Sequence, residues 1–148
     1  MHKIRDWLYI SDFNTAASAS MLKKHGIEAV LLLHRRTPID VESLYLPVYD
    51  AKPVPHNLFK QAEGFIQLQY DKKRPLLSSC GAGVSRSVVF AMLALHKIEN
   101  LTMRESYLDI VSRHPAAMPD HQHWDSLQAY LDENQDFWEV WQEVVGLD

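Results

Sequence analysis

The feature that most constrains this chain is the segment 80–87, which reads Cys-Gly-Ala-Gly-Val-Ser-Arg-Ser. An apolar stretch at 75–79 precedes it, and an almost wholly apolar stretch at 88–95 follows it. This order predicts a buried strand, a tight turn and a buried helix, with the cysteine and the arginine at the turn. A strand and helix joined in this way favour an α/β fold with the turn at the carboxyl end of a central strand.

The predicted turn has the chemistry of an anion-binding site. The first N–H groups of a helix lack intrahelical acceptors, and the helix dipole adds positive potential at the same end. Gly81 and Gly83 permit backbone angles that direct N–H groups toward one point, and Arg86 presents a fork that matches two phosphate oxygens. The same field favours the thiolate of Cys80, so the pattern predicts a nucleophile directed at phosphorus.

A structural alternative is a buried cysteine that packs as a small hydrophobe, with Ser85 or Ser87 capping the helix. That alternative leaves the two glycines and Arg86 unexplained, so we favour the phosphate site. The predicted substrate-binding residues are Gly81, Ala82, Gly83, Val84, Ser85 and Arg86.

Composition limits the classes of protein to which the chain can belong. Its 148 residues suit one domain, and 47% hydrophobic and 23% charged residues are typical of a globular protein. The net charge of −4 disfavours broad binding to nucleic acids or acidic membranes. The single cysteine excludes an internal disulfide and fits a reducing cytoplasm. No apolar run is long enough to cross a bilayer, and the N-terminus lacks a signal-peptide core.

The order of elements along the chain predicts the fold class. Strands are expected over 8–10, 27–33, 44–48 and 76–79. Helices are expected over 15–25, 56–70, 87–98, 102–114, 120–131 and 136–145. Two strand–helix–strand units followed only by helices predict an α/β domain with a small central, mostly parallel sheet flanked by helices. We expect one domain over 1–148, with a C-terminal helical extension from about 132 to 148.

Capping residues mark several helix ends. Asn14 is placed to cap the first helix, and Gly26 to end it. Thr102 and Glu105 form a capping-box pattern. Apolar residues at helical spacing in the last segment are interpreted as core packing; they are Phe137, Val140, Trp141 and Val144.

The string Cys-x-x-Gly-x-x-Arg-Ser, between a strand and an apolar helix, resembles the phosphate-binding loop of the protein tyrosine phosphatase superfamily. Its form Ala-Gly-Val-Ser-Arg-Ser is most similar to the dual-specificity branch, and the likeness covers roughly residues 7–131. The segment Leu46-Pro47-Val48-Tyr49-Asp50 resembles the strand and loop that carry the family's general acid. In low-molecular-weight tyrosine phosphatases the acid follows the cysteine loop, whereas Asp50 precedes it here.

The resemblance implies a protein phosphatase that works through a cysteinyl-phosphate and requires no metal or other cofactor. It implies four catalytic residues: Cys80 as nucleophile, Arg86 as phosphate ligand, Asp50 as general acid and Ser87 as the hydroxyl that stabilises the departing thiolate. Asp40 is a second candidate for the acid, and Asp50 could instead be a turn residue. The expected partners are phosphorylated proteins or peptides, with phosphotyrosine first, and phosphate or vanadate-like oxyanions.

One position departs from the family pattern. The family usually has histidine directly before the cysteine, and this chain has Ser79, which brings neither a ring nor a charge. A weakly active or inactive phosphopeptide-binding module therefore stays open, as does a phosphatase for a nucleotide, RNA end, glycan or other small molecule. Arg35 and Arg36 follow a predicted strand and are either substrate contacts or solvated surface.

Overall fold

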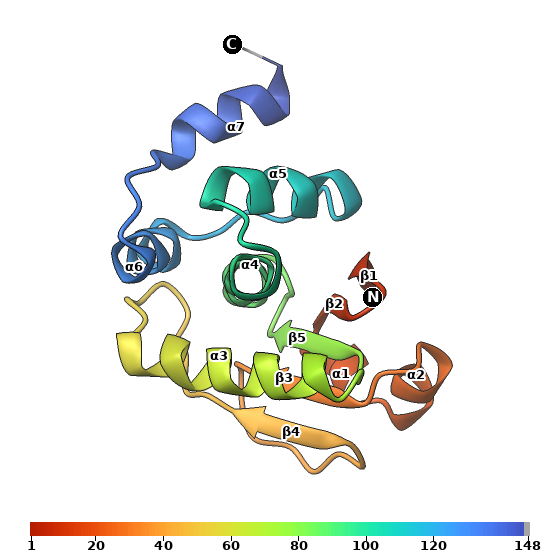
Figure 1. The fold of residues 1–148 in the computed structure, drawn as a ribbon. Helices are drawn as coiled ribbons and strands as arrows, with labels where there is room; N and C mark the ends of the chain where they lie inside the picture. Colours follow the sequence, from red (N-terminus) through yellow and green to blue (C-terminus); the bar gives the residue numbers. More distant parts are fainter. Residues whose placement is uncertain (147–148) are drawn as a thin grey trace.

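A five-stranded sheet with the strand order β1-β2-β5-β3-β4 forms the centre of the computed structural model, which describes residues 1–146 (Figure 1). The strands are β1 (His2–Arg5), β2 (Leu8–Asp12), β3 (Ala29–Leu32), β4 (Glu42–Tyr45) and β5 (Leu76–Cys80). Strands β2, β5, β3 and β4 are parallel, and β1 pairs antiparallel with β2. The prediction of a small, mostly parallel sheet is confirmed, and the edge strand β1 lies outside the predicted strands.

Helices cover both faces of this sheet. They are α1 (Phe13–Ala16), α2 (Ala19–Lys24), α3 (His56–Asp71), α4 (Arg86–Glu99), α5 (Met103–Arg113), α6 (His121–Leu131) and α7 (Phe137–Val145). Figure 1 shows α4 end-on in the middle of the molecule, with α3 on one side and α5 on the other. All residues of α4 from 86 to 95 are buried, as the almost continuous apolar sequence predicts.

The alternation of side chains along β5 decides what each of its residues faces. Leu76 and Cys80 belong to the main core with α4, whereas Leu77 packs in a second cluster with Leu22 of α2. Since successive strand residues point to opposite faces, Cys80 faces the α4 side and Ser79 the other. The predicted place of the cysteine, at the end of a central strand before a buried helix, is confirmed.

The prediction of one helix over 15–25 is wrong. The chain forms two short helices, because two capping side chains lie close together: Asp12 accepts from the Thr15 amide and Ser18 from the Met21 amide. Ser18 is extended, with φ −92° and ψ 109°, which breaks the helical run. Asn14 lies inside α1 rather than at its cap. Gly26 has a φ of +67° just after α2, which confirms its role at the helix end.

The strand predicted at 44–48 is shifted to Glu42–Tyr45. Pro47 has no amide to donate to a ladder, so the regular strand ends before it, although the Leu46 amide still donates to Leu32 O over 3.0 Å. The predicted capping box of Thr102 with Glu105 is present in α5.

The C-terminal segment is helical over Phe137–Val145, as predicted, and packs beside α5. Val140 is buried and Phe137 packs against the core, but Trp138 is 60% exposed. The rest of the predicted extension, Leu147 and Asp148, lies outside the described residues. Among residues 1–146, no helix is both long and apolar enough to pass through a bilayer.

The capping carboxylate of Asp12 predicts a pH-dependent contribution to stability. Hydrogen bonding by Thr15 lowers the pKa of Asp12 below its usual range. Because the folded state then has the lower pKa, the contribution is present above the unfolded pKa and is lost as the pH falls through the folded pKa. Asp12→Ala is expected to lower the free energy of unfolding by about 1 kcal/mol at neutral pH and much less in acid. Urea unfolding at both pH values measures this, and an equal loss at both would contradict it.

Candidate active site

The loop between β5 and α4 holds Cys80 and Arg86 at its two ends. The amide of Gly83 donates to Cys80 Sγ over 3.3 Å, and Sγ lies 3.2 Å from Ser87 Oγ. An amide and a hydroxyl that can both donate to a sulfur anion therefore surround the thiol. Since α4 begins at Arg86, the first amides of this helix, which have no intrahelical acceptors, lie at the same place.

The guanidinium of Arg86 is anchored by backbone carbonyl groups. Nη1 donates to Val48 O over 2.9 Å and to Leu33 O over 3.3 Å, and Nη2 lies 3.4 Å from His34 Nδ1. A Cβ placed on Gly81 would lie 3.2 Å from Arg86 Nη2, so the guanidinium lies against the first loop residue. The side chain is thus fixed beside the loop, and Nε together with the second hydrogen of Nη2 can still donate to an anion.

The two loop glycines serve different purposes. Gly83 has a φ of +78°, and a Cβ there would lie 2.8 Å from Ser11 C, so both its backbone angle and its contact with β2 require glycine. Gly81 has no left-handed φ, so its backbone angle does not require glycine. Its missing side chain leaves room for the Arg86 guanidinium instead.

Gly83→Ala is expected to destabilise the fold by about 1–3 kcal/mol and to lower turnover of an aryl phosphate, since the loop must move away from Ser11. Gly26→Ala is the matched control: Gly26 also has a positive φ, +67°, but a Cβ placed there would have no neighbour within 4 Å. Urea unfolding and steady-state hydrolysis measure the two effects. If both variants lost activity equally, the contact between Gly83 and Ser11 would not matter to the site.

The segment 114–120 donates hydrogen bonds to the loop between β5 and α4. Three successive loop residues accept hydrogen bonds from it: Gly83 O from His114 Nε2 (2.7 Å), Val84 O from the Met118 amide (2.8 Å) and Ser85 Oγ from the Asp120 amide (2.7 Å). The His2 ring of β1 stacks on His114 with 3.8 Å between centroids, and burial lowers the pKa of His2, which favours its neutral form.

Ser85 occupies the N-cap position of α4, but its side chain makes no capping hydrogen bond, so its hydroxyl does not serve the helix cap that the structural alternative expected. Its Oγ lies 2.6 Å from Nδ1 of His123, a fully buried residue of α6. Sequence reasoning overlooked both His114 and His123 as parts of this region. For His123 a signal existed: it lies four residues before buried Leu127, and so on the inner face of α6.

Asp50 lies beyond the carboxyl end of β4, whose strand runs parallel to β3 and β5. The carboxyl ends of parallel strands meet at one edge of a sheet, so Asp50 lies at the edge where Cys80 ends β5. Asp40 precedes β4 and therefore lies toward the opposite edge. The backbone next to Asp50 is tied to the site, because Val48 O accepts from Arg86 and Tyr49 O from His123 Nε2 at 3.1 Å.

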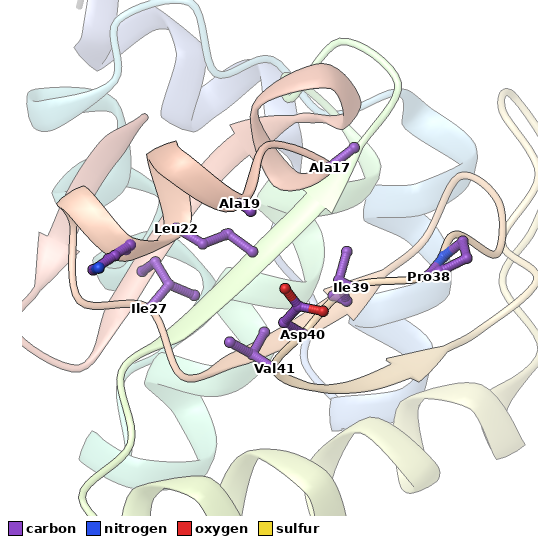
Figure 2. Close-up of a pocket in the computed structure, with 9 residues that line it drawn as sticks. Ala17, Ala19, Leu22, Ile27, Pro38, Ile39, Asp40 and Val41 are labelled. Carbon is purple, nitrogen blue, oxygen red and sulfur yellow. The ribbon is translucent and has the colours of Figure 1, made fainter.

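Asp40 instead borders an apolar groove of about 390 Å³ (Figure 2). Leu22 and Ile27 face Ile39 and Val41 across this groove. No residue of the segment 80–87 lines it, so the groove is separate from the cysteine loop.

The two arginines after β3 lie over aromatic rings. The guanidinium carbon of Arg35 is 4.3 Å from the centroid of Phe13, and that of Arg36 is 4.8 Å from the centroid of Tyr45. These contacts are typical of cation–π pairs. They account for the placement of both side chains without a substrate.

Comparison with known proteins identifies the family of this chain. A family model for the dual specificity phosphatase catalytic domain matches residues 8–133. Dual specificity protein phosphatase 22-B of Danio rerio is 29% identical over 134 residues, which cover 88% of this chain and 73% of that protein.

Solved structures show the same fold. Human DUSP28 superposes with a TM-score of 0.82 at 19% identity, over 89% of this chain and 96% of its own. A mouse putative dual specificity phosphatase, complexed with zinc tungstate, has a TM-score of 0.79 at 21% identity, over 87% of this chain and 84% of its own.

Proposed function

This chain belongs to the dual specificity phosphatase family, and from that premise we propose that Cys80, Arg86, Asp50 and Ser87 carry its hydrolysis of phosphate monoesters. The chain is a phosphoric monoester hydrolase by its family. The observation that supports this choice of residues is the sulfur of Cys80, 3.3 Å from the Gly83 amide and 3.2 Å from the Ser87 hydroxyl, beside an anchored Arg86.

In the first step, Cys80 Sγ attacks phosphorus in line and the bond from phosphorus to the leaving oxygen breaks. The loop amides of residues 81–86 and the free donors of Arg86 hold the three non-bridging oxygens. Asp50 gives its proton to the leaving oxygen. Phosphoryl transfer depends chiefly on positioning and charge stabilisation, which a rigid loop and an anchored guanidinium provide.

In the second step, ionised Asp50 takes a proton from a water molecule that attacks the cysteinyl-phosphate. The bond between sulfur and phosphorus breaks, and Cys80 leaves as a thiolate. The Gly83 amide and the Ser87 hydroxyl stabilise that thiolate, since both lie within hydrogen-bonding distance of sulfur. Inorganic phosphate is released and Asp50 is protonated again, so the cycle needs no metal or redox partner.

Because Ser79 replaces the histidine that the family usually has before the cysteine, a second candidate function is a weakly active phosphopeptide-binding module. The Ser79 hydroxyl donates to Leu31 O over 3.1 Å, on the face of the sheet opposite Cys80, so it gives the sulfur no direct support. The Gly83 amide and the Ser87 hydroxyl supply that support instead, which favours the active enzyme.

The substrates we propose are phosphotyrosine in proteins or peptides, with phosphoserine and phosphothreonine as further substrates. Hydrolysis of p-nitrophenyl phosphate, with vanadate as inhibitor, tests activity, and peptides that carry each phosphoresidue test the range. Binding of phosphopeptides without turnover would support the binding module. Faster turnover of nucleotides or sugar phosphates than of any peptide would assign a non-protein substrate.

Two further features belong to this proposal. The family match ends at residue 133, so we assign the segment from about 132 onward, including α7, as a helical extension of one catalytic domain. The mechanism requires a reduced thiol at the chain's single cysteine, which suits the cytoplasm.

A further inference from the structure

The side chain of His123 joins the two loops that the mechanism needs. It comes from α6 and is fully buried. Nδ1 lies 2.6 Å from Oγ of Ser85, in the phosphate-binding loop. Nε2 lies 3.1 Å from the carbonyl oxygen of Tyr49, the residue directly before Asp50. One rigid ring therefore spans the distance between the loop of the nucleophile and the loop of the acid.

The partners of His123 define where its proton lies. A carbonyl oxygen can only accept, so Nε2 carries the hydrogen that is donated to Tyr49 O. When the imidazole is neutral, Nδ1 accepts from the Ser85 hydroxyl, whose oxygen in turn accepts from the Asp120 amide over 2.7 Å. Every polar atom in this chain of bonds has a partner when the imidazole is neutral. The ring can thus hold both loops without carrying a charge.

The loop of Asp50 needs an external anchor. Asp50 is exposed, and the next residue, Ala51, has a φ of +54°, a conformation that is unfavourable for a residue with a side chain. The nearest fixed points are the carbonyl groups of Val48, bound by Arg86, and Tyr49, bound by His123. A second bond from α6 lies farther along, where Ser126 Oγ accepts from the Val54 amide over 2.9 Å.

From these contacts we propose that His123 is a positioning residue, which sets the place of Asp50 relative to Cys80 without touching the substrate. This inference rests on the proposed role of Asp50 as the general acid. Loss of the bond to Tyr49 O would let the Asp50 loop shift while the phosphate-binding loop keeps its supports from 114–120. Attack by Cys80 would continue, and proton transfer to the leaving group would suffer.

The test compares two leaving groups in His123→Phe, which keeps an aromatic ring and removes both hydrogen bonds. Phenyl phosphate, which needs the acid, is expected to lose about 10²-fold in kcat, the order that misplacement of a catalytic group by about 1 Å can cost. p-Nitrophenyl phosphate, whose leaving group needs little protonation, is expected to change far less. His123→Gln, which again offers a donor and an acceptor, is expected to restore part of the loss.

Two further variants give the comparison its controls. Ser126→Ala removes a buried hydrogen bond from the same helix but leaves the Tyr49 anchor, and it is expected to keep the wild-type ratio of the two rates. In an Asp50→Ala background, His123→Phe is expected to change that ratio no further. If His123→Phe does not fold, His123→Asn replaces it as the test variant. The shorter amide of asparagine can reach Ser85 but not Tyr49. This variant is expected to change the ratio of the rates for phenyl phosphate and p-nitrophenyl phosphate as His123→Phe would.

The outcomes separate this proposal from the proposed function. A wild-type protein that hydrolyses neither phosphate would refute the function itself. An active wild-type protein whose His123 variants lower both rates equally, or change neither, would overturn the positioning role and leave the function intact. Vanadate binding by the His123 variants, measured by calorimetry, is expected to match the wild type because the phosphate-binding loop keeps its other supports; a loss of binding would mean that His123 merely holds that loop together.

Discussion

Cys80→Ser is expected to lower the hydrolysis of p-nitrophenyl phosphate by about 10⁶-fold, the order of loss when the nucleophile of a covalent hydrolase is removed. A serine hydroxyl is a much weaker nucleophile than a thiolate, and the Gly83 amide and the Ser87 hydroxyl lie within hydrogen-bonding distance of the sulfur. Steady-state rates measure the loss. The fold should persist, because the substitution exchanges one small buried side chain for another and leaves the packing of β5 against α4 in place.

The control for Cys80→Ser is Ser79→Ala, one residue earlier on the same strand. Ser79 is equally buried but faces the other side of the sheet, where it donates to Leu31 O. Its loss should cost stability and leave the chemistry near the wild-type rate. Cys80→Ser should still bind vanadate through Arg86 and the loop amides. Substantial turnover by Cys80→Ser would refute covalent catalysis by this residue.

Asp50→Ala is expected to lower kcat for phenyl phosphate by about 10²–10⁴-fold, the usual contribution of a general acid. The loss should be much smaller for p-nitrophenyl phosphate, since p-nitrophenolate leaves readily without a proton. A plot of log kcat against the acidity of the leaving phenol measures this difference as a steeper slope. Asp50 is exposed, so the variant should fold normally.

Asp40→Ala is the matched control for Asp50→Ala, since it removes the same carboxylate from the segment before β4 rather than after it. Asp40 borders the apolar groove and lies toward the opposite edge of the sheet (Figure 2). Its loss should leave the leaving-group slope unchanged. If the plot of log kcat against leaving-phenol acidity became steeper in Asp40→Ala and stayed unchanged in Asp50→Ala, the general acid would be Asp40 rather than Asp50.

Much of the fold could be predicted because its signals are local. The capping box of Thr102 with Glu105 and the apolar run that forms α4 depend on neighbours within one or two helical turns. The errors arose where two local signals compete or where the partner is distant. Asp12 and Ser18 each start a helix within a few residues, which divided the helix predicted at 15–25. Strand β1 has four residues and exists through its pairing with β2.

The place of the loop could also be predicted from the sequence, because Cys80, both glycines, Arg86 and the start of α4 lie within a few residues of one another. An anion site of this kind depends on the order of those residues and on the backbone of one turn. Even so, the sequence did not separate the two glycines: Gly83 adopts the left-handed conformation, whereas Gly81 makes room for a guanidinium.

The sequence alone predicted Cys80 as the nucleophile, the loop that follows it, and two candidates for the acid, Asp50 and Asp40. Only the tertiary structure decided that Asp50 rather than Asp40 lies at the edge of Cys80, since parallel pairing of β3, β4 and β5 brings their carboxyl ends together. It also decided that carbonyl groups hold Arg86 and that His123 joins the two loops. Every residue has a carbonyl group, so no sequence pattern identifies the carbonyl groups that bind Arg86 and His123. Long-range packing brings those carbonyl groups to the two side chains.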